Sequence, residues 1–106
     1  MSVDVVNPPA TSKHHGLVFL LTGSACPEQY NVVDGAGQQV GYVRLRHGLL
    51  TVTWPNAYGE KIVLKTFGDG LGCFKDQAQR TVWLEKAALT IISRTLCVRD
   101  YEGKAG

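Results

Sequence analysis

The stretch from Gln38 to Trp54 constrains the fold most, because it contains a two-residue turn between two runs of alternating side chains. His47-Gly48 can close such a turn, since glycine tolerates the positive φ that tight hairpins need. Strand side chains alternate between faces, so a shift of one residue would mix apolar and polar sides. With this turn, one face carries Val43, Leu45, Leu50, Val52 and Trp54. The other face carries Tyr42, Arg44, Arg46, Thr51 and Thr53.

Three further strand-like runs surround this hairpin, at residues 17–22, 30–33 and 61–67. The turn from Asp34 to Gly37 contains two glycines and joins the second run to the hairpin. In the last run, alternation favours Ile62 and Leu64 for the apolar face. It favours Lys61 and Lys65 for the polar face, which would then hold Tyr42, Arg44, Arg46, Lys61 and Lys65.

A helix is predicted from Asp76, a residue suited to the N-cap position, to about Leu96. Apolar residues recur there at helical spacing, and such a helix can cover the apolar face of the sheet. The positions are Val82, Trp83, Leu84, Ala87, Ala88, Ile91 and Ile92.

The predicted fold class is therefore α+β, with an antiparallel β-sheet of about four or five strands and one C-terminal helix on its apolar face. A chain of 106 residues has the size of one domain, and a second core would leave each half too small. We expect a flexible N-terminal arm over residues 1–15, a single domain over 16–98 and a flexible tail over 99–106.

Charge and cysteine content narrow the protein class. The formal net charge of +2 is too small to indicate nucleic-acid binding without clustering of cations. The three cysteines, at positions 26, 73 and 97, are dispersed and form no Cys-x-x-Cys pair. This spacing argues against a disulfide framework and against a zinc site, and it fits a reducing cytosol. The apolar run of residues 17–21 is too short for a signal peptide or a membrane span. We expect a cytoplasmic protein with no membrane contact.

The basic sheet face is the first candidate binding site. Arg44 and Arg46 could make multi-donor contacts to phosphate or carboxylate, with Tyr42 beside them for stacking. Lys61 and Lys65 would add longer-range attraction. The alternative is an ordinary solvated face, since an antiparallel sheet with one wet side carries polar residues there routinely.

The glycine-rich stretch from Phe67 to Gly72 is a second candidate, because backbone N–H groups of Gly68, Gly70 and Gly72 could hold a phosphate or another anion. It lacks the Lys-Ser/Thr pair of a P-loop and the spacing of a dinucleotide fingerprint. A flexible link from sheet to helix is the favoured explanation. The flanking aspartates match no standard metal loop, and we expect neither a metal nor a cofactor.

A small hydrolase is a third class of function. It would need a nucleophile with a histidine, and the sequence offers Cys73 in the glycine-rich loop and His47 at the predicted turn. Nothing in the spacing indicates that the two residues meet. We therefore expect no enzymatic activity.

The segments "PEQYNVVDGAGQQVGYVRLRHG" (Pro27 to Gly48) and the later Gly68-Asp69-Gly70 resemble a group of small uncharacterised proteins of bacteriophages and mobile elements. The resemblance covers residues 17 to 96. It implies no catalytic residue. It implies a small protein that acts on a host component, such as a counter-defence inhibitor of the anti-CRISPR kind.

The functional expectation is a non-catalytic binding protein that engages a host protein through its basic sheet face or an exposed edge of the sheet. Direct binding of nucleic acid or a nucleotide by the same face is the alternative. A homodimer is a further expectation, because an open sheet has edges that must be covered, charged or paired.

Overall fold

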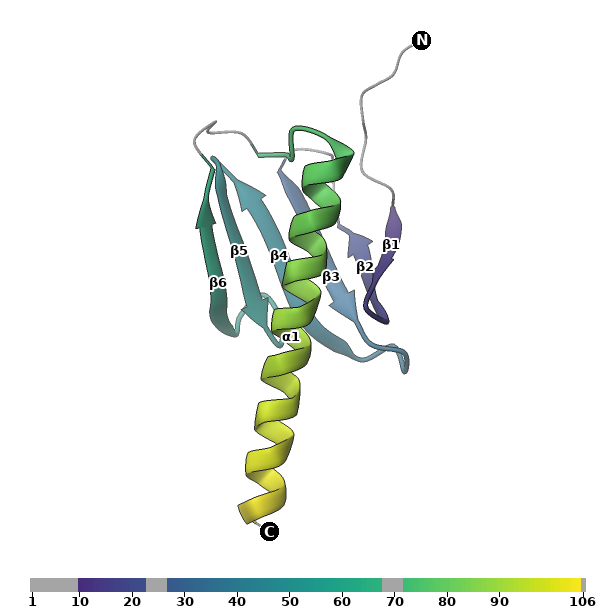
Figure 1. The fold of residues 1–106 in the computed structure, drawn as a ribbon, viewed down its shortest axis with the longest axis vertical. Coiled ribbons are helices and arrows are strands. Elements are labelled where there is room, and N and C mark those ends of the chain that lie inside the picture. Colours follow the sequence, from purple (N-terminus) through teal and green to yellow (C-terminus); the bar gives the residue numbers. More distant parts are fainter. Residues whose placement is uncertain (1–9, 23–26, 68–71, 106) are drawn as a thin grey trace.

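The computed structural model describes residues 10–22, 27–67 and 72–105. It confirms the α+β class: one antiparallel sheet is crossed on one face by a single C-terminal helix (Figure 1). Within these residues the sheet has six strands rather than four or five, and each pairs only with its neighbours in sequence. The elements are β1 (Thr11–His14), β2 (Leu17–Leu21), β3 (Glu28–Val33), β4 (Gln39–Arg46), β5 (Leu49–Trp54), β6 (Glu60–Thr66) and α1 (Gln77–Ala105).

The predicted hairpin is confirmed. Strands β4 and β5 are joined by His47 and Gly48, both at positive φ (54° and 76°). Opposed residues are those expected, from Arg46 with Leu49 to Val43 with Val52. The apolar members face α1, and we call the opposite side of the sheet the outer face.

The additional strand β1 lies within the segment that the sequence analysis assigned to a flexible arm, so that assignment is wrong for residues 11–14. β1 pairs with β2 through a second His-Gly turn, in which His15 and Gly16 both have positive φ. The short sequence TSKH has no apolar alternation and therefore gives no strand signal of its own. Residues 1–9 of the proposed arm lie outside the described residues.

A β-bulge in β6 reverses part of the predicted orientation. Val52 lies opposite Val63 and Thr53 lies opposite Lys61, so Ile62 is an extra residue. One extra residue shifts the alternation of all that follow. Leu64 consequently lies opposite Thr51 on the outer face, not in the core. Lys65 lies on the helix side.

The core is formed where α1 crosses the middle strands. Of the described residues, thirteen hydrophobic ones are buried there: Leu17, Phe19, Tyr30, Val32, Val43, Leu45, Leu50, Val52, Phe74, Leu84, Ala87, Ala88 and Ile91. Gly41 permits the close approach, because a Cβ at this position would lie 2.4 Å from Cδ1 of Ile91. Trp54 extends the contact by donating an indole N–H to Thr95 Oγ1 over 3.1 Å.

Helix α1 begins as predicted and ends later. Asp76 is its N-cap, since Oδ1 of Asp76 accepts the backbone N–H of Gln79 over 2.8 Å. The helix continues to Ala105, so residues 99–105, which were expected to form a flexible tail, belong to the helix. Its C-terminal part extends beyond the sheet (Figure 1). Val82, which the sequence analysis grouped with the apolar positions, is 48% exposed on the side away from the sheet.

Candidate functional site

The outer face brings three of the predicted cations together. Arg44 and Arg46 are two residues apart on β4, and Lys61 lies across β5 on β6. All three line one depression of about 480 Å³, which His47, Leu49 and Thr51 complete. We call it the basic depression. Among the described residues, none of the three cations forms an ion pair within the chain.

Apolar side chains accompany these cations. Leu49 is 41% exposed and lines the basic depression. Leu64 is 62% exposed on the same face, opposite Thr51. The site therefore offers both hydrophobic contact and positive charge.

Tyr42 is on the outer face but does not line the basic depression. Its hydroxyl donates to Gln29 Oε1 over 2.7 Å, which holds the half-buried ring along the sheet. A residue held in this way can form one wall of a contact surface. It is not positioned as a projecting anchor.

Lys65 does not belong to this site. It lies opposite Leu50, a core residue, and its Nζ lies 5.7 Å from the centroid of the Trp83 ring on α1. The bulge in β6 explains why simple alternation placed it on the wrong side.

The candidate anion loop is described only at its end, because Gly68 and Gly70 lie outside the described residues. The carbonyl of Gly72 accepts the backbone N–H of Glu28 over 2.7 Å. A Cβ on Gly72 would approach Cα of Pro27 to 3.2 Å. Gly72 thus fastens the segment before α1 to the start of β3, which is a structural role.

The proposed nucleophile of the hydrolase hypothesis, Cys73, is not a free thiol. Cys73 is disulfide-bonded, whereas Cys97 is a free, exposed cysteine. A thiolate is required for nucleophilic attack, so Cys73 cannot serve in this state. The disulfide also shows that the argument from cysteine spacing was wrong. Disulfides persist in oxidising compartments, which weighs against the reducing cytosol that this spacing suggested.

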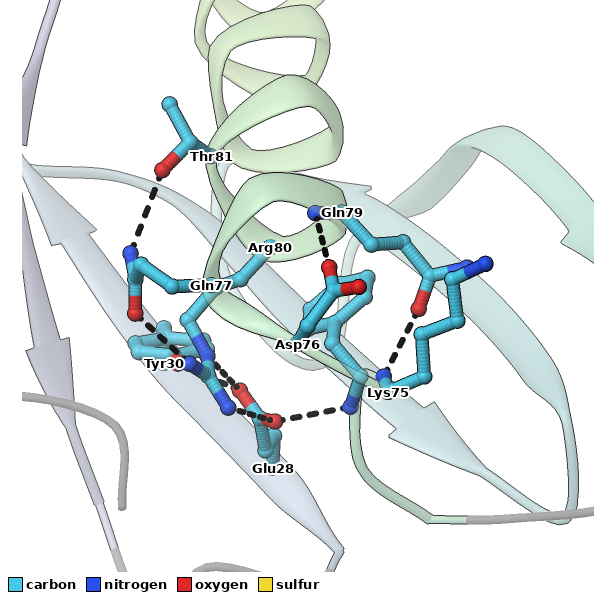
Figure 2. A network of polar contacts seen from close by, with 9 residues as sticks. Glu28, Tyr30, Lys75, Asp76, Gln77, Gln79, Arg80 and Thr81 are labelled. Atoms are coloured by element: carbon cyan, nitrogen blue, oxygen red, sulfur yellow. Dashed lines mark hydrogen bonds and ion pairs between the residues drawn. The ribbon is translucent and has the colours of Figure 1, made fainter. Parts of the chain in front are cut away.

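A buried ion pair between Glu28 and Arg80 was missed by the sequence analysis (Figure 2). Arg80 donates from Nε to Oε1 of Glu28 over 3.0 Å and from Nη2 to Oε2 over 2.8 Å. The Tyr30 hydroxyl and the Phe74 backbone N–H donate to the same carboxylate over 2.6 Å and 2.9 Å. The side chains of Glu28 and Arg80 are 0% and 2% exposed.

This cluster is closed to solvent and its carboxylate accepts four hydrogen bonds, so its role is to join β3 to the first turn of α1. Burial, together with the hydrogen bond to Glu28, raises the pKa of Tyr30 above its ordinary value. The hydrogen bonds to Glu28 raise the pKa of Arg80. Neither group is available as an acid or base at neutral pH.

The periodicity itself contained the missing signal. Glu28 alternates with Tyr30 and Val32, and Arg80 lies one helical turn before Leu84. Two opposite charges at core positions of a strand and a helix predict a buried pair.

A second polar cluster lies where β1 meets α1. His14 is 8% exposed, and its Nδ1 lies 3.8 Å from Oε2 of Glu85. Burial lowers the pKa of His14, and the nearby Glu85 carboxylate opposes that shift. His15 Nε2 lies 4.0 Å from the other oxygen of Glu85. Within residues 10–22, 27–67 and 72–105, no group of three potential metal ligands is present.

Two remaining observations concern the chain as a whole. Within the part that the structure describes, no helix combines the length and apolar character needed to span a bilayer. Comparison with protein-family models, curated proteins and solved structures finds no match.

Proposed function

We propose that this chain is a binding protein without catalytic activity, and that the basic depression engages an acidic surface on a protein partner. One observation carries the proposal: Arg44, Arg46 and Lys61 converge on one depression, and none of them is neutralised by a described carboxylate of the chain. Charge-assisted contacts from arginine to carboxylate are among the stronger polar contacts that proteins make.

The mixture of side chains favours a protein over a nucleic acid as partner. Leu49 and Leu64 are exposed beside the cations, and arginine with apolar contacts is typical of protein interfaces. Nucleic-acid surfaces usually concentrate many more cations on one face. The net charge of +2 supplies little general attraction to phosphate backbones.

The partner class follows from the resemblance to bacteriophage and mobile-element proteins, which supports a host protein as the target and a counter-defence inhibitor as the role. Such a target would place the protein in the host cytoplasm. The Cys73 disulfide favours an oxidising compartment instead. Alkylation of thiols inside intact cells, followed by a non-reducing gel, decides between the two: a reduced Cys73 supports the cytoplasm.

The proposal is tested by affinity capture from the native host with three forms of the protein. These are the wild type, the Arg44→Ala/Arg46→Ala variant and a Lys13→Ala/Lys75→Ala control, which removes the same charge from exposed positions outside the basic depression. We expect a protein that survives nuclease treatment, is captured by wild type and control, and is lost with the arginine variant. Capture that does not depend on the arginines contradicts the proposal.

Direct nucleic-acid binding by the same arginines remains the second candidate, because guanidinium groups also match phosphate. Nucleic-acid binding of this kind is recognised by an affinity that falls steeply as the salt concentration rises. Two results together would replace the protein-partner proposal. The captured complex would disappear with nuclease, and titrations of single-stranded DNA would show this salt dependence and require Arg44 and Arg46.

A further inference from the structure

Strand β6 is one edge of the sheet. Its seven residues, Glu60–Thr66, pair with β5, and no other described strand lies beside them. An open strand edge presents unpaired backbone N–H and C=O groups, which are a template for pairing with another strand.

The backbone direction identifies which groups are open. Phe67 donates its N–H to the Gly48 carbonyl over 2.6 Å, so this residue faces β5. Backbone groups of an antiparallel strand alternate in direction, and Val63 and Lys65 face β5 in the same way. Leu64 and Thr66 therefore direct their N–H and C=O groups toward the open edge.

A depression lies on each side of this edge. The basic depression occupies the outer face, and one of about 580 Å³ lies on the helix side. Lys61 lines both, so both border the same part of β6. A strand added along β6 would send alternate side chains to the two faces and so toward the two depressions. The helix-side depression is lined by Glu60, Lys61, Ile62, Leu89, Thr90, Ser93, Arg94 and Cys97.

The charges specify the chemistry of each side. The outer face offers Arg44, Arg46 and Lys61 to carboxylates. On the helix side, Arg94 and Glu60 already form an ion pair, which leaves Ile62 and Leu89 for apolar contact. A strand with acidic residues on one face and apolar residues on the other fits both depressions.

A second copy of the chain fits less well. Two β6 strands related by a two-fold axis place the outer faces of both copies on the same side of the joined sheet. The second copy would therefore bring Arg44, Arg46 and Lys61 again to that side, and like charges on one face repel one another.

We propose that β6 is the docking edge for an extended strand of the partner, with carboxylates toward the basic depression and apolar side chains toward α1. This inference rests on the proposed function and states how the partner is held. Backbone pairing along β6 provides the affinity, and the two depressions select the side chains.

The test uses a synthetic peptide of about nine alternating valine and glutamate residues, long enough to cover the edge. A valine-lysine peptide of the same length is the control ligand. Amide hydrogen exchange of the full chain is followed by NMR. We expect the acidic peptide to slow exchange at Leu64 and Thr66, and the lysine peptide to have no effect.

Two variants distinguish the contribution of the open backbone edge from that of the Leu64 side chain. Leu64→Pro removes an N–H that faces the open edge and leaves the pairing with β5 intact, because proline is tolerated at edge positions. Leu64→Ala removes the same apolar side chain and keeps the N–H. We expect the acidic peptide to bind Leu64→Ala and to bind Leu64→Pro at least about tenfold more weakly. The exchange measurement on the wild type needs neither variant to fold.

Three results would overturn strand addition: unchanged exchange at Leu64 and Thr66 at millimolar peptide, equal binding by folded Leu64→Pro and Leu64→Ala, or a free dimer that Leu64→Pro dissociates. Partner capture that depends on the arginines but is unaffected by Leu64→Pro would overturn this inference alone. Capture that does not depend on the arginines would overturn the proposed function, whatever the peptide does at β6.

Discussion

Removal of the guanidinium from the buried ion pair should be among the most damaging single changes to this fold. In Arg80→Met, an unbranched side chain of high helix propensity replaces arginine, so α1 itself loses little. Glu28 keeps the hydrogen bonds from Tyr30 and Phe74 but loses two from Arg80 and its only close cation among the described residues. An uncompensated charge in a site that is 0% exposed costs about 3–5 kcal/mol of unfolding free energy.

Urea unfolding at neutral pH, followed by tryptophan fluorescence, measures this loss. Trp83 lies on α1, and Trp54 is hydrogen-bonded to Thr95 of the same helix, so the fluorescence of both reports on the docking of the helix. With a urea slope of about 1–3 kcal/mol/M, the midpoint should fall by at least about 1 M. The slope itself should stay constant, because the surface exposed on unfolding changes little.

The control is Glu28→Gln/Arg80→Met. This double variant removes both charges, and the glutamine can still accept a hydrogen bond from Tyr30. We expect it to be more stable than Arg80→Met alone, although it has lost more native contacts. A loss below about 1 kcal/mol in Arg80→Met, or a double variant less stable than the single one, would refute the assignment of the cost to an unpaired buried charge.

Three other predictions test the fold and its titrating groups. Gly41→Ala should lower the unfolding free energy by about 1–3 kcal/mol, because its Cβ would lie 2.4 Å from Cδ1 of Ile91. Adding Ile91→Val to the same chain should recover part of that loss, as measured by urea titration. The folded pKa of His14 lies below the unfolded value of 6.5, so the contribution of His14 to the unfolding free energy should be full above pH 6.5 and fall as the pH drops from there toward the folded pKa. The His14→Gln variant should flatten this pH dependence, even though Glu85 and His15 still face the site. Iodoacetamide with peptide mapping should modify Cys97 in the native protein and Cys73 only after reduction, and labelling of Cys73 without reductant would contradict its disulfide.

The sequence predicted well where one local rule determined the outcome. The register of β4 and β5 follows from a two-residue turn and a period of two, and both are local. The start of α1 follows from Asp76 at the N-cap. These features do not depend on distant parts of the chain, so the local sequence is enough to predict them.

Predictions failed where a distant contact or an inserted residue decided the outcome. The extra residue Ile62 in β6 reversed the sides of Leu64 and Lys65, and no sequence pattern marks that bulge. β1 forms because β2 offers an edge to pair with, although its own residues lack alternation. The buried pair of Glu28 and Arg80 was not predicted because charged residues mostly lie at the surface, although both occupy core positions in the periods of β3 and α1. Alternation assigned Arg44, Arg46 and Lys61 to the side of the sheet on which they lie, whereas it assigned Lys65 to the wrong side.

The order in which strands lie side by side has a consequence for how the chain reaches its native state. Since each described strand pairs only with those adjacent in sequence, the sheet can form one hairpin after another through short loops whose closure costs little entropy. The long-range step is the return of α1, which joins residues 52 positions apart through Glu28 and Arg80. We therefore expect helix docking to govern the refolding rate, with the meander formed earlier as its template.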